Sequence, residues 1–249
     1  MRETLYGRQE VREALRAQRR EPYRLVLAEG IISAPVVDEI VALAQERRVS
    51  IDYMNRRYMD SLVGDENHQG VALEAAGYPY VSVYDMLDLA KERKEPPLIL
   101  LLDLVQDVRN LGAILRTLEA VGGHGAVIQG RRAAGITPAA ANVSSGAVEH
   151  LLVAQVTNLS QTVEQLKAAE LWIAGLEDVY GSQPYTEVDL SGPLGIVVGS
   201  EGEGLRRLVR ERCDYLLSIP MRGEINSLNA SVAGSVVLCE VVRQRGLIG

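Results

Sequence analysis

The strongest constraint on the fold is a series of short, almost continuous apolar runs that begins at residue 98. Strands buried on both faces have such sequences, and they occur in parallel sheets covered by helices. The segments between the runs have the periodicity of helices. The sequence therefore predicts an α/β fold over residues 98–249, with strands at "LILLLDL", "GAVIQG", "LLVAQV", "LWIAGLE", "LGIVVGS" and "YLLSIP".

The first 76 residues also alternate between helical and strand patterns. Pro35 stands near the start of the second expected helix, where a proline is tolerated. The linker-like stretch that follows contains one short helix and a charged run closed by Pro96 and Pro97. We therefore expect a domain over 1–76, a linker over 77–97 and a second domain over 98–249. In the first domain, helices are predicted over 7–18, 35–48 and 56–63, and strands over 23–29, 49–54 and 70–76.

Charge and hydropathy narrow the class of protein. The net charge of −7 argues against wholesale coating of nucleic acid but leaves a local basic surface open. Only three of the 26 basic residues are lysine, an arginine bias that suits RNA phosphates and that a GC-rich genome would also produce. No apolar run approaches the roughly 20 residues that cross a bilayer, and the N-terminus is too charged for a secretory signal. We expect a cytoplasmic protein without membrane association.

The two cysteines, Cys213 and Cys239, have neither a CxxC spacing nor a nearby histidine. Metal binding and a disulfide are therefore not expected. Both side chains are predicted to be buried as small hydrophobes.

Three loops follow strands of the expected parallel sheet, whose ligands sit beyond the carboxyl ends of the strands. The first is "VQDVRNLGAILRTLEAVGG", in which Asp107 or Asn110 can cap a helix that ends at Gly122. Arg116 lies on this helix and is one of few charges there. It is either a functional residue or an arginine whose stem packs on the surface while its head reaches water.

The second loop is the glycine-rich "VVGSEGEGLRRLVRERC". It has no phosphate-loop or dinucleotide fingerprint, and Glu201 and Glu203 would repel phosphate oxygens. Such a turn suits a neutral or cationic ligand, for example a sulfonium. The alternative is a tight structural turn with Glu201 near a helix N-terminus, where the helix dipole favours a carboxylate.

The third loop is "IPMRGEINSLNASVAGS", and it begins the last helix. Ser227 or Asn226 is the expected N-cap, and Leu228, Val232, Val236 and Cys239 form the expected apolar stripe. Small residues over 230–235 allow another backbone or a flat ligand to approach closely, or a tight helix contact. Ser227 and Asn229 carry polar groups that need partners at the end of a strand.

Together the three loops resemble the motifs of the SPOUT-class, TrmH-like RNA ribose 2′-O-methyltransferases. "DVRNLGAILRT" corresponds to the first motif, "VVGSEGEGL" to the second and "SIPMRGEINSLNASVA" to the third. "LYGRQEVREAL" and "HQGVAL" are similar to the ends of the L30e-like domain that precedes the catalytic domain in this family. One departure is Asp107-Val108, where relatives have Asp-Pro, so the loop loses a preset backbone angle.

The resemblance implies an L30e-like domain followed by a SPOUT domain with a deep trefoil knot, acting as a homodimer whose sites draw on both subunits. It implies S-adenosylmethionine as cofactor, and 23S rRNA as substrate, methylated on a guanosine ribose in the peptidyl-transferase centre. No metal is implied. The implied catalytic residues are Asn110, Arg116, Glu201, Ser227 and Asn229; the implied cofactor-binding residues are Gly199, Ser200, Glu201, Gly202, Ile219, Met221, Ser227 and Leu228.

The first domain is the expected reader of RNA, which arginines contact through phosphates and stacking. Acids such as Glu10 and Glu13 could instead pair with these arginines on a solvated face. The candidate RNA contacts are Arg8, Arg12, Arg19, Arg20, Arg56 and Arg57.

Three other functions remain as alternatives. A tRNA ribose methyltransferase or an antibiotic-resistance enzyme acting on rRNA would use the same chemistry, although the simplest tRNA enzymes lack an L30e-like domain. A catalytically silent relative would bind rRNA during ribosome assembly, but retention of the five implied catalytic residues argues against it. A nucleotide-dependent dehydrogenase lacks its glycine fingerprint here.

Overall fold

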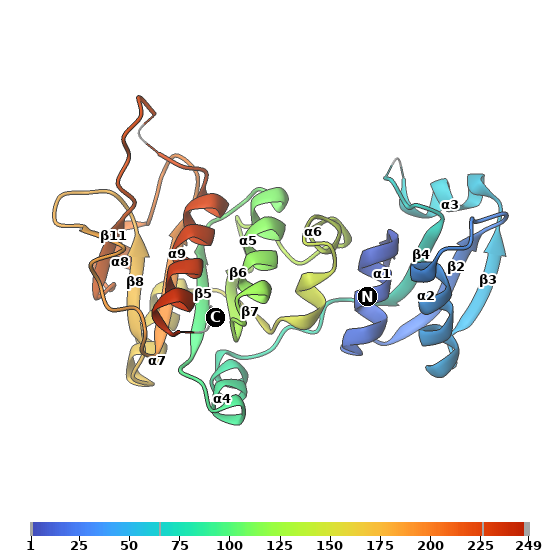
Figure 1. The fold of residues 1–249 in the computed structure, drawn as a ribbon, viewed down its shortest axis with the longest axis horizontal. Coiled ribbons are helices and arrows are strands. Elements are labelled where there is room, and N and C mark those ends of the chain that lie inside the picture. The colour runs from blue at the N-terminus through green and yellow to red at the C-terminus, as the bar shows by residue number, and fades with distance from the viewer. Residues whose placement is uncertain (1, 65, 226, 247–249) are drawn as a thin grey trace. The chain divides into compact units, whose positions relative to one another are not determined.

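The structure is a computed structural model that describes residues 2–64, 66–225 and 227–246. Its contacts separate two compact units. The first unit comprises Met1–Pro79 and Ile136–His150, and the second comprises Tyr80–Gly135 and Leu151–Gly249. Figure 1 labels the elements of both.

The first unit is built on a four-stranded sheet of order β1-β4-β2-β3, in which only β2 and β3 run parallel. The predicted helices and strands are present, and one strand, β1, was not predicted. Its sequence RETLY has only two apolar residues, too few for a strand pattern. The elements are β1 (Arg2–Tyr6), α1 (Arg8–Ala17), β2 (Pro22–Ala28), α2 (Pro35–Glu46), β3 (Ser50–Met54), α3 (Arg56–Val63) and β4 (Val71–Ala76).

The first unit also takes in a segment from far along the chain. Helix α6 (Pro138–Val143) and the 3₁₀ helix η1 (Ala147–His150) pack on α1, and α6 also contacts β1. Ala140, Ala141 and Val148 are buried there. The linear division expected from the sequence does not anticipate this segment, because its short, alanine-rich pattern says nothing about which sheet it covers.

The second unit contains a seven-stranded sheet of order β7-β6-β5-β10-β8-β11-β9. Every neighbouring pair is parallel, which confirms the predicted parallel sheet. All six apolar runs form strands, and a seventh strand of two residues, β9, lies at one edge of the sheet. The strands are β5 (Leu98–Asp103), β6 (Gly125–Gln129), β7 (Val153–Val156), β8 (Trp172–Leu176), β9 (Gln183–Pro184), β10 (Leu194–Gly199) and β11 (Tyr215–Ser218).

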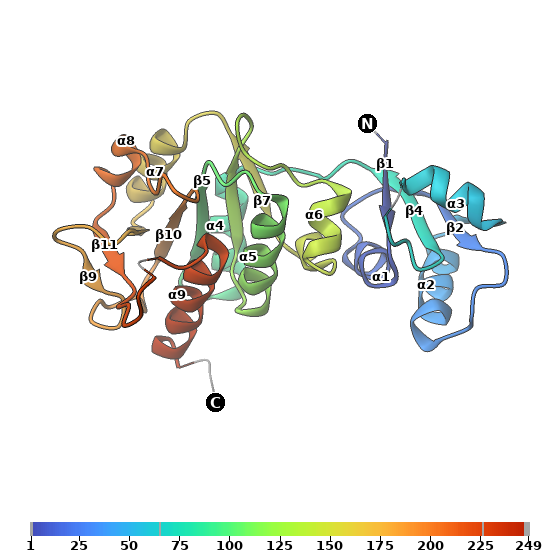
Figure 2. The same cartoon turned by 90° about the horizontal axis from the view of Figure 1, so that it is seen from above.

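Helices cover both faces of this sheet. α4 (Val83–Arg93), α7 (Leu159–Ala168) and α8 (Arg207–Arg210) pack with Ile99 and Leu101 in one apolar cluster. On the opposite face lie α5 (Val108–Ala120) and α9 (Ala230–Gln244), which are side by side in Figures 1 and 2. Strand residues are therefore buried on both faces, and each fully buried leucine or isoleucine contributes about 1.5–3 kcal/mol.

The orientation of α9 differs from the predicted one. Leu228, Val232 and Cys239 of the expected apolar stripe are exposed. The buried face instead contains Val237, Leu238 and Val241, with Gly234 at the contact with α5. A Cβ atom on Gly234 would lie 2.4 Å from the Ile114 Cδ1 atom, so a larger residue here would force the Ile114 side chain to move. The face of α9 that packs against the sheet and α5 is therefore not the face with the more regular apolar stripe.

The cysteines also depart from expectation in part. Both are free; Cys239 is exposed, whereas Cys213 is half-buried. Burial raises the pKa of Cys213 to about 12, so its thiol stays protonated. Nowhere in the described ranges does a helix have the length and apolar character to span a membrane. The trefoil knot stays a prediction.

Candidate functional site

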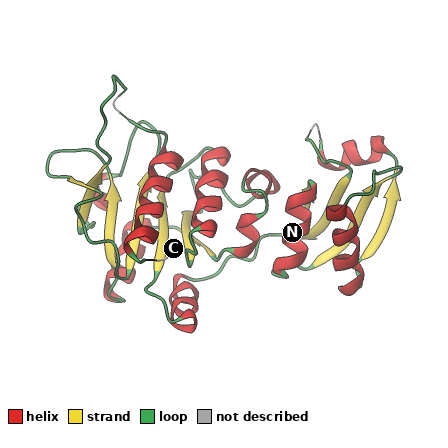
Figure 3. Cartoon of the chain, viewed as in Figure 1, coloured by secondary structure: helices red, strands yellow, loops and turns green. Residues whose placement is uncertain are grey.

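A cavity of about 600 Å³ opens at the carboxyl ends of β8, β10 and β11. This is the size range of small-molecule sites. The loop that leads into α9 extends beyond the strands at this end of the sheet (Figure 3). Every residue expected to bind the cofactor lines the cavity: Gly199, Ser200, Glu201, Gly202, Ile219, Met221, Ser227 and Leu228.

The glycine-rich turn forms one wall of the cavity. A Cβ atom on Gly199 would lie 2.3 Å from the Gly204 carbonyl carbon, so the turn closes on itself. The Gly204 N–H donates to the Ser200 carbonyl at 3.1 Å, and Gly202 and Gly204 have positive φ angles of 84° and 67°. Because α8 begins only at Arg207, Glu201 lies in this turn and not at a helix N-terminus as one interpretation held.

Asn229 joins the three loops. Its Nδ2 donates to Asn110 Oδ1 at 2.9 Å and to Glu201 Oε1 at 3.3 Å. Its Oδ1 accepts from the backbone N–H of Ser231 at 2.9 Å and from the Ser231 hydroxyl at 2.7 Å. One amide therefore fixes the first and second loops against the start of α9.

Side chains of the loops cap the N-termini of α5 and α9. Asn229 is the N-cap of α9, so the expectation of Ser227 or Asn226 was wrong for Ser227; Asn226 lies outside the described residues. Ser227 is exposed and lines the cavity. Asp107, one of two candidates, is the N-cap of α5, with its carboxylate accepting from the Arg109 N–H at 2.6 Å.

Arg116 lies on the same helix as Asn110. It is exposed on α5, six residues beyond Asn110, which is a rise of about 9 Å along a helix. It is not among the residues that line the cavity. The structure thus brings together Asn110, Glu201 and Asn229, whereas Arg116 does not line the cavity.

Two ion pairs outside the predicted set hold the chain that follows the glycine turn. Asp103, fully buried at the end of β5, accepts from the backbone N–H of Arg206 at 2.9 Å and from its Nε at 2.7 Å. Glu177 binds Arg210 through both carboxylate oxygens, and this hydrogen bonding raises the pKa of Arg210. The partners are 103 positions apart in the first pair and 33 in the second, so no local sequence pattern could predict either contact.

The predicted RNA contacts fall into three groups. Arg8 and Arg56 line a hollow of about 680 Å³ in the first unit, and Arg57 is exposed. Arg12 pairs with Glu13 at 2.8 Å, and Arg19 donates to the hydroxyl of Tyr78 at 2.9 Å.

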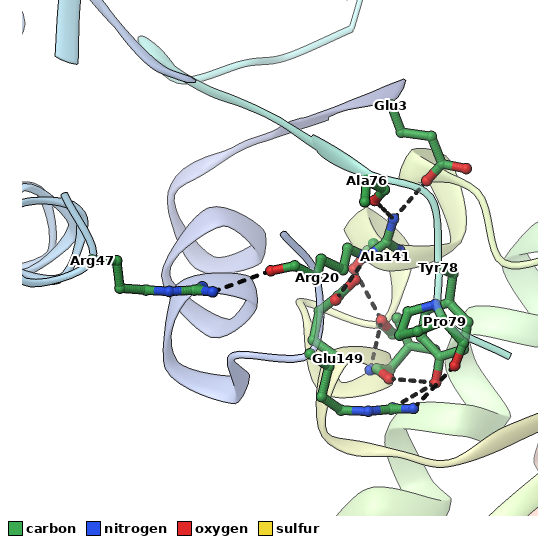
Figure 4. Close-up of polar contacts among 11 residues, drawn as sticks. Glu3, Arg20, Arg47, Ala76, Tyr78, Pro79, Ala141 and Glu149 are labelled. Carbon is green, nitrogen blue, oxygen red and sulfur yellow. Dashed lines mark hydrogen bonds and ion pairs between the residues drawn. The ribbon is translucent and has the colours of Figure 1, made fainter. Parts of the chain in front are cut away.

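Arg20 is the clear exception among these arginines. It is 2% exposed and donates to Glu149 Oε2 at 2.9 Å and to Glu3 Oε2 at 2.6 Å (Figure 4). The expectation that Arg20 contacts RNA was wrong, because this side chain ties β1 and η1 together inside the first unit.

The cavity combines an apolar part with exposed carboxylates. Leu176, Val198 and Ile219 give it an apolar part, and the carboxylates of Asp178, Glu201 and Glu203 lie around it. Exposed carboxylates attract a cation and repel phosphate. The lining therefore suits a ligand that has an apolar part and a positive charge.

Two sequence-family models match the chain. Residues 97–239 match the SpoU rRNA Methylase family. Residues 4–81 match a family described as RNA 2′-O ribose methyltransferase substrate binding.

Individual proteins are similar over nearly the whole chain. YacO of Bacillus subtilis, named as a TrmH family tRNA/rRNA methyltransferase, is 41% identical over 98% of this chain and 96% of its own length. The SpoU methyltransferase AviRb from Streptomyces viridochromogenes, solved with AdoMet, is 25% identical with a TM-score of 0.80, covering 99% of this chain and 91% of AviRb. The A. aeolicus TrmH/SpoU tRNA modifying enzyme is 29% identical with a TM-score of 0.56, covering 65% of this chain and 85% of that one.

Proposed function

Because this chain belongs to the SpoU rRNA methylase family of S-adenosylmethionine-dependent RNA 2′-O-ribose methyltransferases, we propose that its substrate is 23S rRNA and its target a guanosine of the peptidyl-transferase centre. The observation that carries the rRNA assignment is the presence of both units. A substrate-binding family model matches residues 4–81 in addition to the SpoU rRNA Methylase model over 97–239, whereas the tRNA modifying enzyme of A. aeolicus covers 65% of the chain. An rRNA substrate would place the enzyme in the cytoplasm, as predicted from the sequence.

The cavity is the proposed cofactor site. When bound there, S-adenosylmethionine supplies an activated methyl group on a sulfonium. Glu201 and Glu203 would offset this positive charge, and the backbone of Gly199, Ile219 and Leu228 would hold the adenosyl part. A side chain at Gly199 would collide with Gly204, so only glycine lets the backbone face the ligand.

Asn229 is proposed to align the site. Its amide keeps Asn110 and Glu201 in one arrangement, which limits the motion that separates a bound ribose from the donor. Methyl transfer is an in-line displacement, so alignment supplies much of the rate. Ser227 at the cavity wall completes the set of residues that would contact cofactor or nucleotide.

Arg116 is proposed to bind the phosphate next to the target ribose and to stabilise the alkoxide that forms at its 2′-oxygen. A guanidinium is always protonated in proteins, so it is not the base. Water or an RNA phosphate oxygen would take the proton. Lysine cannot reproduce bidentate binding, so an Arg116→Lys variant that kept native turnover would contradict this role.

The exposed side of α9 is the proposed dimer interface. Val232, Val236 and Cys239 form an apolar groove with Ala113 and Thr117 of α5, and Arg116 lies beside it in sequence. Arg116 lines neither this groove nor the cavity, but it lies between Ala113 and Thr117 on the same helix, which supports the expectation that each active site draws on both subunits. The protein should sediment as a dimer, and Val236→Asp should shift it toward the monomer; a wild-type monomer at micromolar concentration would contradict the interface.

The decisive assay combines purified protein, radiolabelled S-adenosylmethionine and unmodified 23S rRNA. We expect one 2′-O-methylguanosine in the peptidyl-transferase region, mapped by primer extension, and at least a ~100-fold lower rate with Arg116→Ala, in line with loss of a transition-state donor. Methylation of tRNA or of an rRNA adenosine would establish one of the alternative enzymes. Cofactor binding without transfer to any RNA would favour the silent assembly factor.

A further inference from the structure

A group of arginines on the sheet of the second unit lies outside the cavity and outside the predicted RNA contacts. Arg131 and Arg132 follow β6 directly after Gly130, and Arg109 lies in the first turn of α5 after β5. All three are exposed. We call them the edge arginines.

The two loops that carry the edge arginines are bonded to each other. β5 and β6 run parallel with Leu101 opposite Val127, so both loops leave the sheet at its carboxyl end. The Leu104 N–H donates to Gln129 Oε1 at 3.1 Å, and the Ala134 N–H donates to the Val105 carbonyl at 2.9 Å. The edge arginines therefore share one surface that is fixed by the fold.

The acid nearest to the edge arginines in sequence, Asp107, caps α5 by accepting from the Arg109 backbone N–H. No hydrogen bond or ion pair of the side chains of Arg109, Arg131 or Arg132 occurs in the described part of the chain. Arg206 and Arg210, farther along the same end of the sheet, are instead held by Asp103 and Glu177. The backbone of Arg132 is in the left-handed region at φ 57°, a costly conformation for a residue other than glycine.

The carboxyl end of the sheet is electrically polarised. The exposed acids Asp178, Glu201 and Glu203 follow β8 and β10, whereas the edge arginines follow β5 and β6. In the sheet order β6-β5-β10-β8, two strand spacings of ~4.8 Å separate the loop after β6 from β10. A cationic ligand is favoured at the acidic side and a polyanion at the arginine side, about 10 Å apart.

We infer that the edge arginines bind phosphates of the RNA strand beside the target nucleotide, so that the second unit has an RNA-binding surface of its own. Arginine forks match phosphate oxygens bidentately. The strand would cross the ends of β6 and β5 and reach the cavity where Asn110 joins Glu201 and Asn229. This inference rests on the proposed function, because it names the path of the same RNA substrate.

The test replaces Arg131 and Arg132 by glutamine, which keeps the stem of each side chain. The affinity for a 23S rRNA fragment should fall about 10-fold or more, and the slope of log K against log salt should fall by about 1.4, since each phosphate contact in a single strand contributes about 0.7. The cofactor affinity, measured by calorimetry, should stay unchanged. The matched control is Arg93→Gln with Lys94→Gln, which removes the same charge from exposed positions at the end of α4, before the amino end of β5.

Charge-retaining variants make the result specific. Arg131→Lys with Arg132→Lys should recover most of the salt slope. A native RNA affinity in the glutamine variant, an equal loss in the α4 control, a lysine variant as weak as the glutamine variant, or a loss of cofactor affinity would each overturn the inference. RNA binding is measured without catalysis, so an enzyme that binds rRNA through these residues but methylates none would refute the proposed function alone.

Discussion

The arginines of the first unit and the edge arginines of the second carry the same charge but face different surroundings. In the first unit Arg12, Arg16, Arg20 and Arg24 all form ion pairs with acids of the same unit. The edge arginines have no such pairing within the described residues. The difference teaches that positive charge counted along a sequence is not positive charge available to RNA, because folding can neutralise it first.

The Arg20 and Glu149 pair offers the largest test of this comparison. Both side chains are almost fully buried, and one oxygen of Glu149 is buried without a hydrogen-bond partner among the described residues. Glu149→Leu should lower the free energy of unfolding by about 3–5 kcal/mol, because it leaves the Arg20 charge buried and only partly compensated. Urea unfolding followed by circular dichroism measures this.

The double variant Arg20→Met with Glu149→Leu is the control for that experiment. Replacing a buried pair by apolar residues of similar volume is often neutral, so much of the lost stability should return. A single variant that lost less than about 1 kcal/mol would show that the pair is no more than a surface ion pair in its energetics.

A smaller effect separates paired from open arginines within the first unit. Arg56→Gln should reduce the salt slope of rRNA binding by about 0.7, the contribution of one phosphate contact. Arg12→Gln should leave that slope almost unchanged, because Glu13 already faces this guanidinium. The measurement is filter binding between 50 and 200 mM salt, and equal slopes for the two variants would break the comparison.

Point variants test the RNA contacts of the first domain more cleanly than deletion of that domain would. Removing everything before residue 95 would take away the partner surface of α6 and η1, whose residues Ala141, Val148 and Glu149 are buried on the first unit. The fragment would expose apolar surface and a buried carboxylate, so its behaviour would report damage as well as lost RNA contacts.

The sequence alone determined the elements whose pattern is local. Runs buried on both faces predicted the parallel strands, and the rule that ligands sit beyond the carboxyl ends of such strands predicted which three loops come together. Both inferences work because the period of a strand and the polarity of its carboxyl end are properties of neighbouring residues. The single residues that line the cavity were named from the resemblance of these loops to family motifs, and their role in binding the cofactor stays a prediction.

The tertiary structure decided what depends on a distant partner. Ser227 and Asn229 are equally good caps by local chemistry, and contacts with Asn110 and Glu201 distinguish Asn229. The last helix has small or apolar residues nearly all round, and in the fold its Gly234 side packs against Ile114 of α5. Arg20 became a core residue and Arg131 an open one for the same reason: whether a charge is paired depends on which acids the fold brings near, and no sequence period encodes that distance.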